Sequence, residues 1–186
     1  MKEYFAEFAG YNAWANDRLY DAAALLSEEQ YREDRGAFFK SVHGTLNHLL
    51  VTDHIWMRRF TGTGDAPDRL DAILHENFAE LREARAREDA RIVAYIDSLD
   101  EDALAGTISY VRVTTPEPQV QALTAALAHF FNHQTHHRGQ AHCLLTAITG
   151  TAPELDLLFY QRLLAAGPAT PGGPARGRSL TDGARR

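Results

Sequence analysis

Apolar side chains return at helical spacing along most of the chain. Residues 3–26 carry one such stripe, and residues 41–60 carry a second that is apolar on two sides, which is typical of a helix buried between neighbours. The second stripe consists of Val42, Leu46, Leu49, Leu50, Met57 and Phe60. Because no proline precedes Pro67 and none lies between Pro67 and Pro116, long helices are permitted across this part of the chain.

Further helices are predicted beyond the break "TGTGDAPD". Residues 69–99 have a polar centre, "REARAREDAR", which is typical of a solvent-facing helix with opposite charges along it. Residues 119–148 form another long helix, and Gly150 provides a natural end for it. The last predicted helix, "PELDLLFYQRLLAA", is short and has Pro153 in its first turn.

Residues 104–119 break the helical pattern. The run "GTISYVRVTTPEP" alternates and is rich in β-branched residues, which predicts an irregular or short hairpin-like connection. This segment is too short to form a sheet-based fold. The sequence therefore predicts an all-α fold, an up-down four-helix bundle with a short additional C-terminal helix.

Composition divides the chain into a body, residues 1–166, and a tail, residues 167–186. At 45% hydrophobic and 24% charged residues, the 186-residue chain is ordinary for a single globular domain. The tail holds three of the seven prolines and five of the thirteen glycines, which predicts disorder. Because the tail carries four Arg and one Asp, a charge of +3, the net charge of -6 leaves -9 on the body. An acidic body disfavours nucleic acid as a partner.

The sequence also predicts where the protein resides. No apolar run is long enough to cross a bilayer, so we expect no membrane partner. The single Cys143 excludes an intramolecular disulfide, and the amphipathic start "MKEYFAEFAGYNAWAN" lacks the pattern of a secretion signal. These features predict a reducing cytoplasm, with Cys143 as an inert buried thiol.

The candidate chemistry lies in the stretch "HFFNHQTHHRGQ", residues 129–140. At about 100° per residue, His133 and His137 fall within the apolar stripe of their helix. His129 and His136 fall at its edge, and His142 lies on the far side. Two histidines at i and i+4 project to one side at a separation that a single transition metal can bridge. His133 and His137 are therefore candidate metal ligands, with His129 as a supporting residue.

Two histidines bind a metal weakly, so a third ligand must come from another helix. The candidates are His43, His48, His54, His75 and carboxylates such as Asp53. His48, in "HGTLNHLL", lies in mid-helix and is modestly favoured over His54. Spacing alone leaves the choice open.

Two histidine motifs carry a family resemblance. The run "SVHGTLNHLLVTDHIWMRRF", followed by "HFFNHQTHHRGQ", resembles the DinB/YfiT-like superfamily, in particular its damage-inducible DinB branch. The stretches "YNAWANDRLY" and "PELDLLFYQR" also match, so the resemblance covers roughly residues 1–165. It implies a four-helix bundle, usually a homodimer, that holds a divalent metal through three histidines. In this sequence these are His48, His133 and His137.

Three neutral imidazoles leave a coordination position open, as in catalytic rather than structural zinc sites. Zinc or nickel is the expected ion, and iron or manganese are alternatives, because ligand type separates these metals poorly. Some members of the superfamily are S-transferases or isomerases that act with low-molecular-weight thiols. The resemblance therefore implies a metal-dependent thiol S-transferase or a related hydrolase or isomerase. The alternative is a non-catalytic metal-binding homodimer, in which the metal has a structural or stress-response role.

The other residues near the motif give no clear evidence of a catalytic role. Gln134 follows His133 where histidine-zinc proteases place a glutamate, and an amide cannot take a proton, so a peptidase is excluded. Three polar residues either orient a ligand or are ordinary helix residues: Asn132, Arg138 and Gln140. Four aromatic residues are interpreted as core or dimer interface rather than as substrate-binding residues: Trp14, Trp56, Phe130 and Phe131.

Overall fold

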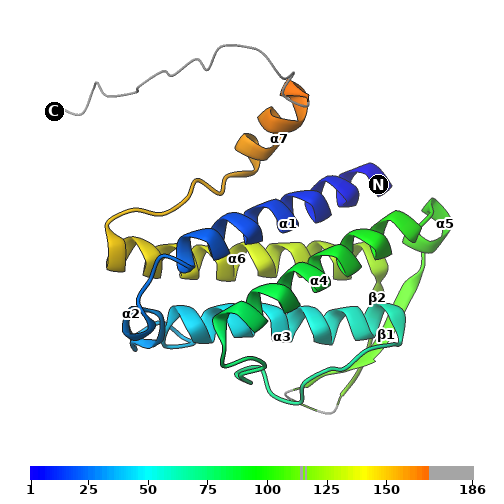
Figure 1. Ribbon diagram of the computed structural model, residues 1–186. Coiled ribbons are helices and arrows are strands. Elements are labelled where there is room, and N and C mark those ends of the chain that lie inside the picture. Colours follow the sequence, from blue (N-terminus) through cyan, green and yellow to red (C-terminus); the bar gives the residue numbers. More distant parts are fainter. Residues whose placement is uncertain (114, 116, 168–186) are drawn as a thin grey trace, which may run out of the picture. The chain divides into compact units, whose positions relative to one another are not determined.

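The computed structural model describes residues 1–113, 115 and 117–167, and these are mostly helical (Figure 1). The helices are α1 (Lys2–Ala23), α2 (Glu28–Arg32), α3 (Val42–Thr61), α4 (Phe78–Ser98), α5 (Glu101–Leu104), α6 (Leu123–Thr149) and α7 (Leu157–Ala166). The strands are β1 (Thr107–Val111) and β2 (Pro118–Ala122). The predicted all-α class is confirmed. The short helices α2 and α5 were not predicted from the sequence.

Local signals in the sequence set the ends of α3. The hydroxyl of Ser41 accepts a hydrogen bond from the backbone N–H of Gly44 at 3.1 Å, which satisfies one of the free donors at the helix start. At the other end Gly62 adopts a left-handed φ of 72°, a conformation that terminates helices and favours glycine. These ends fix which side chains of α3 face its neighbours.

The four long helices pack against one another pairwise. Helix α1 contacts α4 and α6, and α3 contacts the same two helices (Figure 1). Their apolar side chains form two clusters at different levels of the helices. One includes Phe5, Met57, Ile96, Leu127 and Phe130, and the other includes Leu19, Leu46, Leu50, Leu81 and Leu144.

Between the two apolar clusters lies a layer of buried polar side chains contributed by all four long helices. We call it the polar layer: Asn12, Asn16, Asp53, Arg85, Asp89, Gln134 and Arg138. Its centre is an ion-paired group in which the Arg85 guanidinium lies 2.6 Å from Asp53 and 2.9 Å from Asp89. The interpretation of "REARAREDAR" as solvent-facing is therefore wrong for its central residues, because Arg85 and Asp89 are buried.

The predicted helix over residues 69–99 begins too early, because α4 begins at Phe78. The Asn77 side chain caps α4 by accepting hydrogen bonds from the N–H groups of Ala79 and Glu80. Ahead of it, the Asn47 side chain on α3 accepts from the backbone N–H groups at positions 74 and 75 and donates to the carbonyl of residue 75. These bonds hold the segment before Asn77 against α3. Because its backbone groups are bonded to Asn47, they do not form helical hydrogen bonds.

The hairpin-like connection is confirmed as an antiparallel pair of strands. Thr107 pairs with Ala122 and Val111 with Pro118, and α6 begins at the next residue after β2. The start of α6 predicted at residue 119 is therefore too early, because residues 118–122 belong to the strand. The last helix also begins later than predicted, at Leu157 rather than near Pro153.

The chain divides into two units, Met1–Leu155 and Asp156–Arg186. Helix α7 belongs to the second unit and has no buried residue. The tail predicted over residues 167–186 lies, apart from Gly167, outside the described residues, and the boundary expected at residue 166 stays a prediction. Within the described part of the chain, no helix is both long and apolar enough to cross a membrane.

Candidate metal centre

His48 lies in the middle of α3 with both ring nitrogens defined by their surroundings. Its side chain is 2% exposed, and its Nδ1 lies 2.7 Å from the carbonyl oxygen of Leu70. A carbonyl only accepts, so Nδ1 carries the proton and Nε2 keeps a free lone pair. Nε2 is buried and has no hydrogen-bond partner among the described residues. The irregular segment before α4 therefore fixes the ring of His48 in the tautomer that a metal ligand needs.

Helix α6 contributes His133 and His137, one turn apart. Nδ1 of His137 lies 2.8 Å from Oε1 of Gln140, which acts as an acceptor and so places the proton on Nδ1. The Nε2 amide of Gln140 lies in turn 3.2 Å from His136. Gln140 thus orients a candidate ligand, which resolves its role, whereas Asn132 is exposed.

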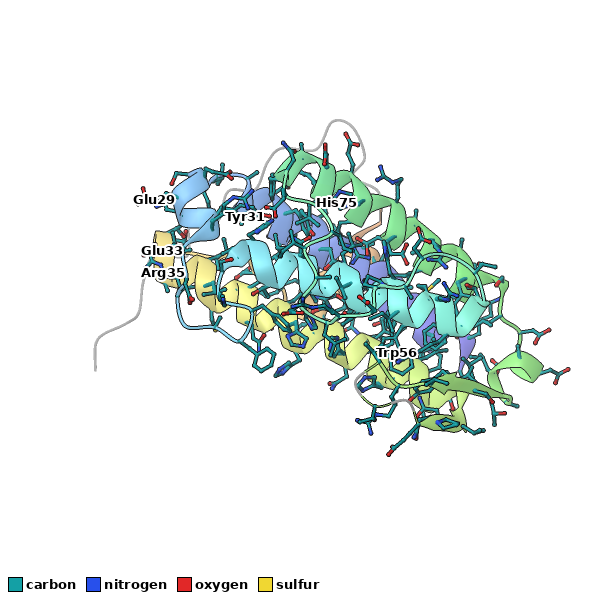
Figure 2. The ribbon with its side chains drawn as sticks, turned by 90° about the horizontal axis from the view of Figure 1, so that it is seen from below. Glu29, Tyr31, Glu33, Arg35, Trp56 and His75 are labelled. Atoms are coloured by element: carbon teal, nitrogen blue, oxygen red, sulfur yellow. The ribbon has the colours of Figure 1, made fainter. Side chains whose placement is uncertain are left out.

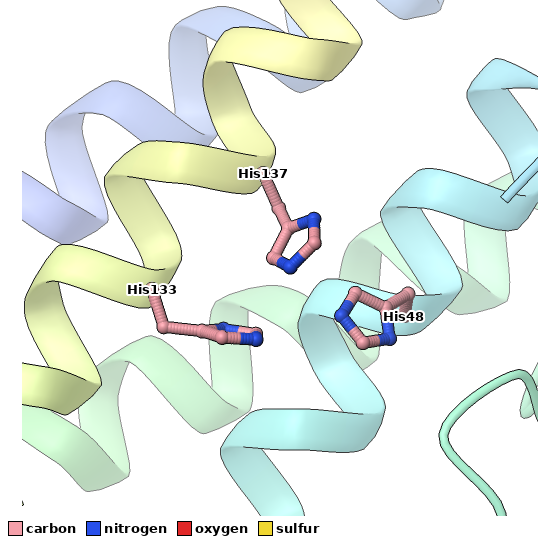
Figure 3. Close-up of side chains that lie close together, drawn as sticks. All are labelled: His48, His133 and His137. Carbon is pink, nitrogen blue, oxygen red and sulfur yellow. The ribbon is translucent and has the colours of Figure 1, made fainter. Parts of the chain in front are cut away.

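His48, His133 and His137 converge between α3 and α6 (Figure 3). We call them the histidine triad. One nitrogen from each ring lies within 4.8 Å of the other two. The ring centroid of His137 lies 4.4 Å from that of His48 and 4.4 Å from that of His133. Three nitrogens at about 2.0–2.1 Å from a common ion lie within roughly 4 Å of one another, so this arrangement is close to that of a bound transition metal.

Burial keeps the triad uncharged. Desolvation is the main cause that lowers the pKa of His48 to about 4 and that of His133 to about 3, and the neighbouring imidazoles act in the same direction. Burial also lowers the pKa of His137. At neutral pH the three rings therefore present lone pairs and no positive charge. A divalent cation fits this donor set, because it supplies the partner that Nε2 of His48 lacks.

A family model matches most of the chain. The family model described as "DinB family" matches residues 1–170. The chain belongs to the DinB family. It is also 22% identical over 168 residues to "Protein DinB" of Bacillus subtilis (strain 168), an alignment that covers 86% of this chain and 95% of that protein. The resemblance proposed from the two histidine motifs is thereby confirmed at the level of the family.

In this DinB chain an aromatic side chain covers one face of the triad. The ring of Phe39 stacks on His48 with centroids 3.6 Å apart and lies 5.5 Å from His137. Gly44 permits this approach, because a Cβ at that position would lie 2.1 Å from the carbonyl oxygen of Phe39. The sequence interpretation missed Phe39. Its only signal is the glycine that follows His43 on α3.

A pocket of about 320 Å³ next to the hairpin reaches the triad at His133. Its lining includes His133, His129 and Trp56, and Trp56 projects from α3 near the hairpin (Figure 2). The ring of His129 lies between those of Trp56 and His133, with centroids 5.2 Å and 5.8 Å away. His129 is thus a neighbour of the triad and not part of it. Trp56 is buried as expected, but it also forms the wall of a pocket.

The remaining histidines of this DinB family member have partners elsewhere. His43 contacts the carbonyl of His75, His54 lies 3.6 Å from Glu88, and His142 contacts the carbonyl of Pro153. Asp53, the other alternative ligand, faces Arg85 in the polar layer. None of these alternatives belongs to the triad.

Two interpretations of α6 need correction. Cys143 is exposed, not buried, because it lies on the outer side of the helix. Arg138 is buried in the polar layer, where its guanidinium donates to Asn12 and Asn16. Helical geometry explains the arrangement. Gln134 and Arg138 follow His133 and His137 by one residue, about 100° around the helix, and so enter the polar layer rather than the triad.

Proposed function

We propose that the protein binds one divalent metal ion through His48, His133 and His137, and that this ion supports a thiol S-transfer or a related hydrolytic or isomerising reaction. The observation that carries the proposal is the buried Nε2 of His48. It has no partner among the residues that the structure describes, and it shares a space with two further imidazoles. A histidine that only filled the core would leave this acceptor unsatisfied, at a cost of about 1–3 kcal/mol.

The donor set favours zinc or nickel. Imidazole nitrogens suit zinc, nickel, copper and iron, whereas magnesium and calcium prefer oxygen ligands. A zinc ion held by these three histidines would lower the pKa of a bound water to about 7, or would hold a thiol as thiolate.

The residues of the chain itself have separate tasks in this scheme. The carbonyl of Leu70 and the amide of Gln140 orient two ligands. Phe39 shields one face of the triad from water. The pocket that reaches His133 offers a way in for a substrate, which favours a catalytic role over the non-catalytic metal-binding alternative.

The assembly forms a second part of the proposal. The packing of α1, α3, α4 and α6 supports an up-down four-helix bundle. By the family resemblance we propose a homodimer that acts with a low-molecular-weight thiol.

Metal analysis of the purified protein tests the site. We expect about one equivalent of divalent metal per chain in the wild type and a large loss in His48→Ala and His133→Ala. His142→Ala is the matched control, because it removes a histidine from the same helix as His133 but outside the triad. Equally little metal in the wild type and all variants would sink the proposal.

Turnover separates the catalytic role from the structural one. The metal-loaded wild type is expected to join a cellular thiol to an electrophile, and the His133→Ala variant to lose this activity while the His142→Ala control keeps it. A protein that binds metal and unfolds at lower temperature without it, but never turns over, supports the non-catalytic alternative instead.

A further inference from the structure

A cation, the guanidinium of Arg59, lines the pocket beside the triad. Arg59 on α3 lines the pocket and is half-buried, and burial lowers the pKa of its guanidinium. No carboxylate of the described residues lies within ion-pair distance of it. The guanidinium donates a long hydrogen bond, 3.4 Å, to the carbonyl of Val111. A partly desolvated guanidinium without a counter-ion is an electrostatic cost that an anionic ligand removes.

Two aromatic rings flank this guanidinium. Arg59 lies 4.5 Å from the ring centroid of Trp56 and 4.2 Å from that of Tyr110. The rings themselves lie 5.4 Å apart in an edge-to-face arrangement. Contacts with ring faces do not use the N–H groups at the edge of the guanidinium. These donors match the two oxygens of a carboxylate.

The charge of the pocket suits a single negative charge. Arg112 also contributes to the lining, but it lies 3.8 Å from Glu117, and both side chains are at least half exposed. Among the described residues that line the pocket, Arg59 is therefore the cation without a carboxylate partner. A carboxylate, with one charge, balances it better than a phosphate with two.

The pocket joins Arg59 to the triad. His48, Thr52, Ile55 and Arg59 follow one another at intervals of four, three and four residues, which places them on one face of α3. Arg59 lies about three turns from His48, or roughly 16 Å along the helix axis. The rings of Tyr110, Trp56, His129 and His133 line the interval, and each lies within 6 Å of the next.

We infer that the substrate entering this pocket carries a carboxylate on a planar, apolar body, with the carboxylate at Arg59 and the reacting end toward His133. The placement of the reacting end depends on the proposed function of the triad, whereas the carboxylate site at Arg59 does not. Arg59 acts here as a specificity-determining residue. Trp56 and Tyr110 position it and contact the body of the substrate.

Calorimetric titration of metal-free protein with benzoate tests the carboxylate site without the metal. We expect benzoate to bind, and the neutral isostere benzamide to bind at least about tenfold more weakly, since a hydrogen bond to a charged group is lost. Benzamide binding as tightly as benzoate overturns the inference. Phenyl phosphate binding more tightly than benzoate overturns the choice of a carboxylate.

Substitutions then locate the site. Arg59→Met is expected to weaken benzoate at least about tenfold. Arg58→Met is the matched control, because the neighbouring arginine is exposed and donates to the carbonyl of Gly64 outside the pocket. Equal affinity for benzoate in Arg59→Met and wild type contradicts the inference, as does an equal loss in the Arg58→Met control.

A third variant covers the case in which Arg59→Met does not fold. Arg59→Lys keeps the charge but loses the planar fork, so benzoate affinity is expected to fall while benzamide affinity stays unchanged. If folded Arg59→Lys binds benzoate as tightly as the wild type does, the planar fork of the guanidinium is not used, and the inference is overturned.

Metal uptake is measured on separate portions of the same metal-free preparations. Benzoate binding that depends on Arg59 in a protein that takes up no metal leaves the carboxylate site standing and defeats the proposed function. Metal uptake without benzoate binding does the reverse.

Discussion

The polar layer and the histidine triad are both polar sites of the core, and consecutive residues of α6 serve them. Gln134 and Arg138 enter the polar layer, whereas His133 and His137 enter the triad. In the polar layer carboxylates and guanidinium groups contact one another, so opposite charges are matched within the protein. In the triad three neutral acceptors face one another, and Nε2 of His48 has no donor among the described residues. Matched charges indicate a structural role, and converging acceptors indicate a ligand.

The largest expected effect comes from breaking the polar layer. Asp53→Ala leaves the buried Arg85 without one of its two carboxylates, so we expect the metal-free protein to lose about 3–5 kcal/mol of its free energy of unfolding. Urea unfolding measures this loss. Glu83→Ala is the control, because its ion pair with Arg87 is exposed and contributes at most about 1 kcal/mol. Similar losses in the two variants would show that the polar layer does not hold the helices together.

The triad is expected to behave in the opposite way. His133→Ala removes a half-buried candidate ligand, so we expect metal affinity to fall more than about 100-fold. This loss exceeds the roughly 10- to 100-fold effect of removing a residue that only orients a ligand. The metal-free variant should lose only about 1 kcal/mol or less of stability. Competition with a chromophoric chelator measures the affinity, and urea unfolding measures the stability. A variant that unfolds like Asp53→Ala but binds metal normally would reverse the assignment of the two sites.

A smaller effect is expected from the residue that orients His137. Gln140→Ala removes the acceptor at Nδ1 of that ring, so metal affinity should fall about 10- to 100-fold while one equivalent still binds at saturation. The same chelator competition measures it. Asn132→Ala, on an exposed position of the same helix, should leave the affinity unchanged.

The smallest effect is expected from mild acid. Because burial lowers the pKa of His48 to about 4 and of His133 to about 3, these rings stay neutral at pH 6, and metal affinity should change little between pH 8 and 6. Protons compete with the metal only as the pH approaches those values, so release is expected below about pH 5. Equilibrium dialysis across this range measures it. Release that is complete at pH 6 would indicate exposed, ordinary imidazoles.

The stability of the metal-free protein should show the complementary dependence on pH. A lowered pKa in the folded state means that the unfolded chain, with imidazoles near 6.5, binds the proton more readily. The contribution of neutral His48 and His133 to folding is therefore present above about pH 6.5 and is lost as the pH falls toward 4.

Helical periodicity revealed most of the helices and two members of the triad, because an amphipathic stripe depends on local spacing. His133 and His137 share a face by one helical turn, a relation that holds in any helix. His48 could be separated from His54 and Asp53 only by resemblance, because the choice depends on which face of α3 meets α6. Long-range contacts also decided where α4 begins, because Asn47 on α3 binds the backbone of residues 74 and 75, just before that helix.

The charge pattern of α4 was misleading for a physical reason. Opposite charges at i and i+4, such as Arg85 and Asp89, look the same whether they pair in water or in a core. Only the neighbouring helices, which contribute Asp53, Asn12 and Asn16, show that these charges are buried. The same limit applies to Arg59, whose surroundings come from α3 and from the hairpin.

The sequence by itself determined the helical class, the family and the pair His133 and His137, because each depends on residue types at short, regular intervals. Tertiary structure decided that the rings of His48, His133 and His137 converge and that Phe39 stacks on His48. It also decided that, among the described residues, Nε2 of His48 has no hydrogen-bond partner and Arg59 has no carboxylate partner. These features arise where distant segments meet, and a lone pair or a charge is free or satisfied only with respect to what has been packed against it.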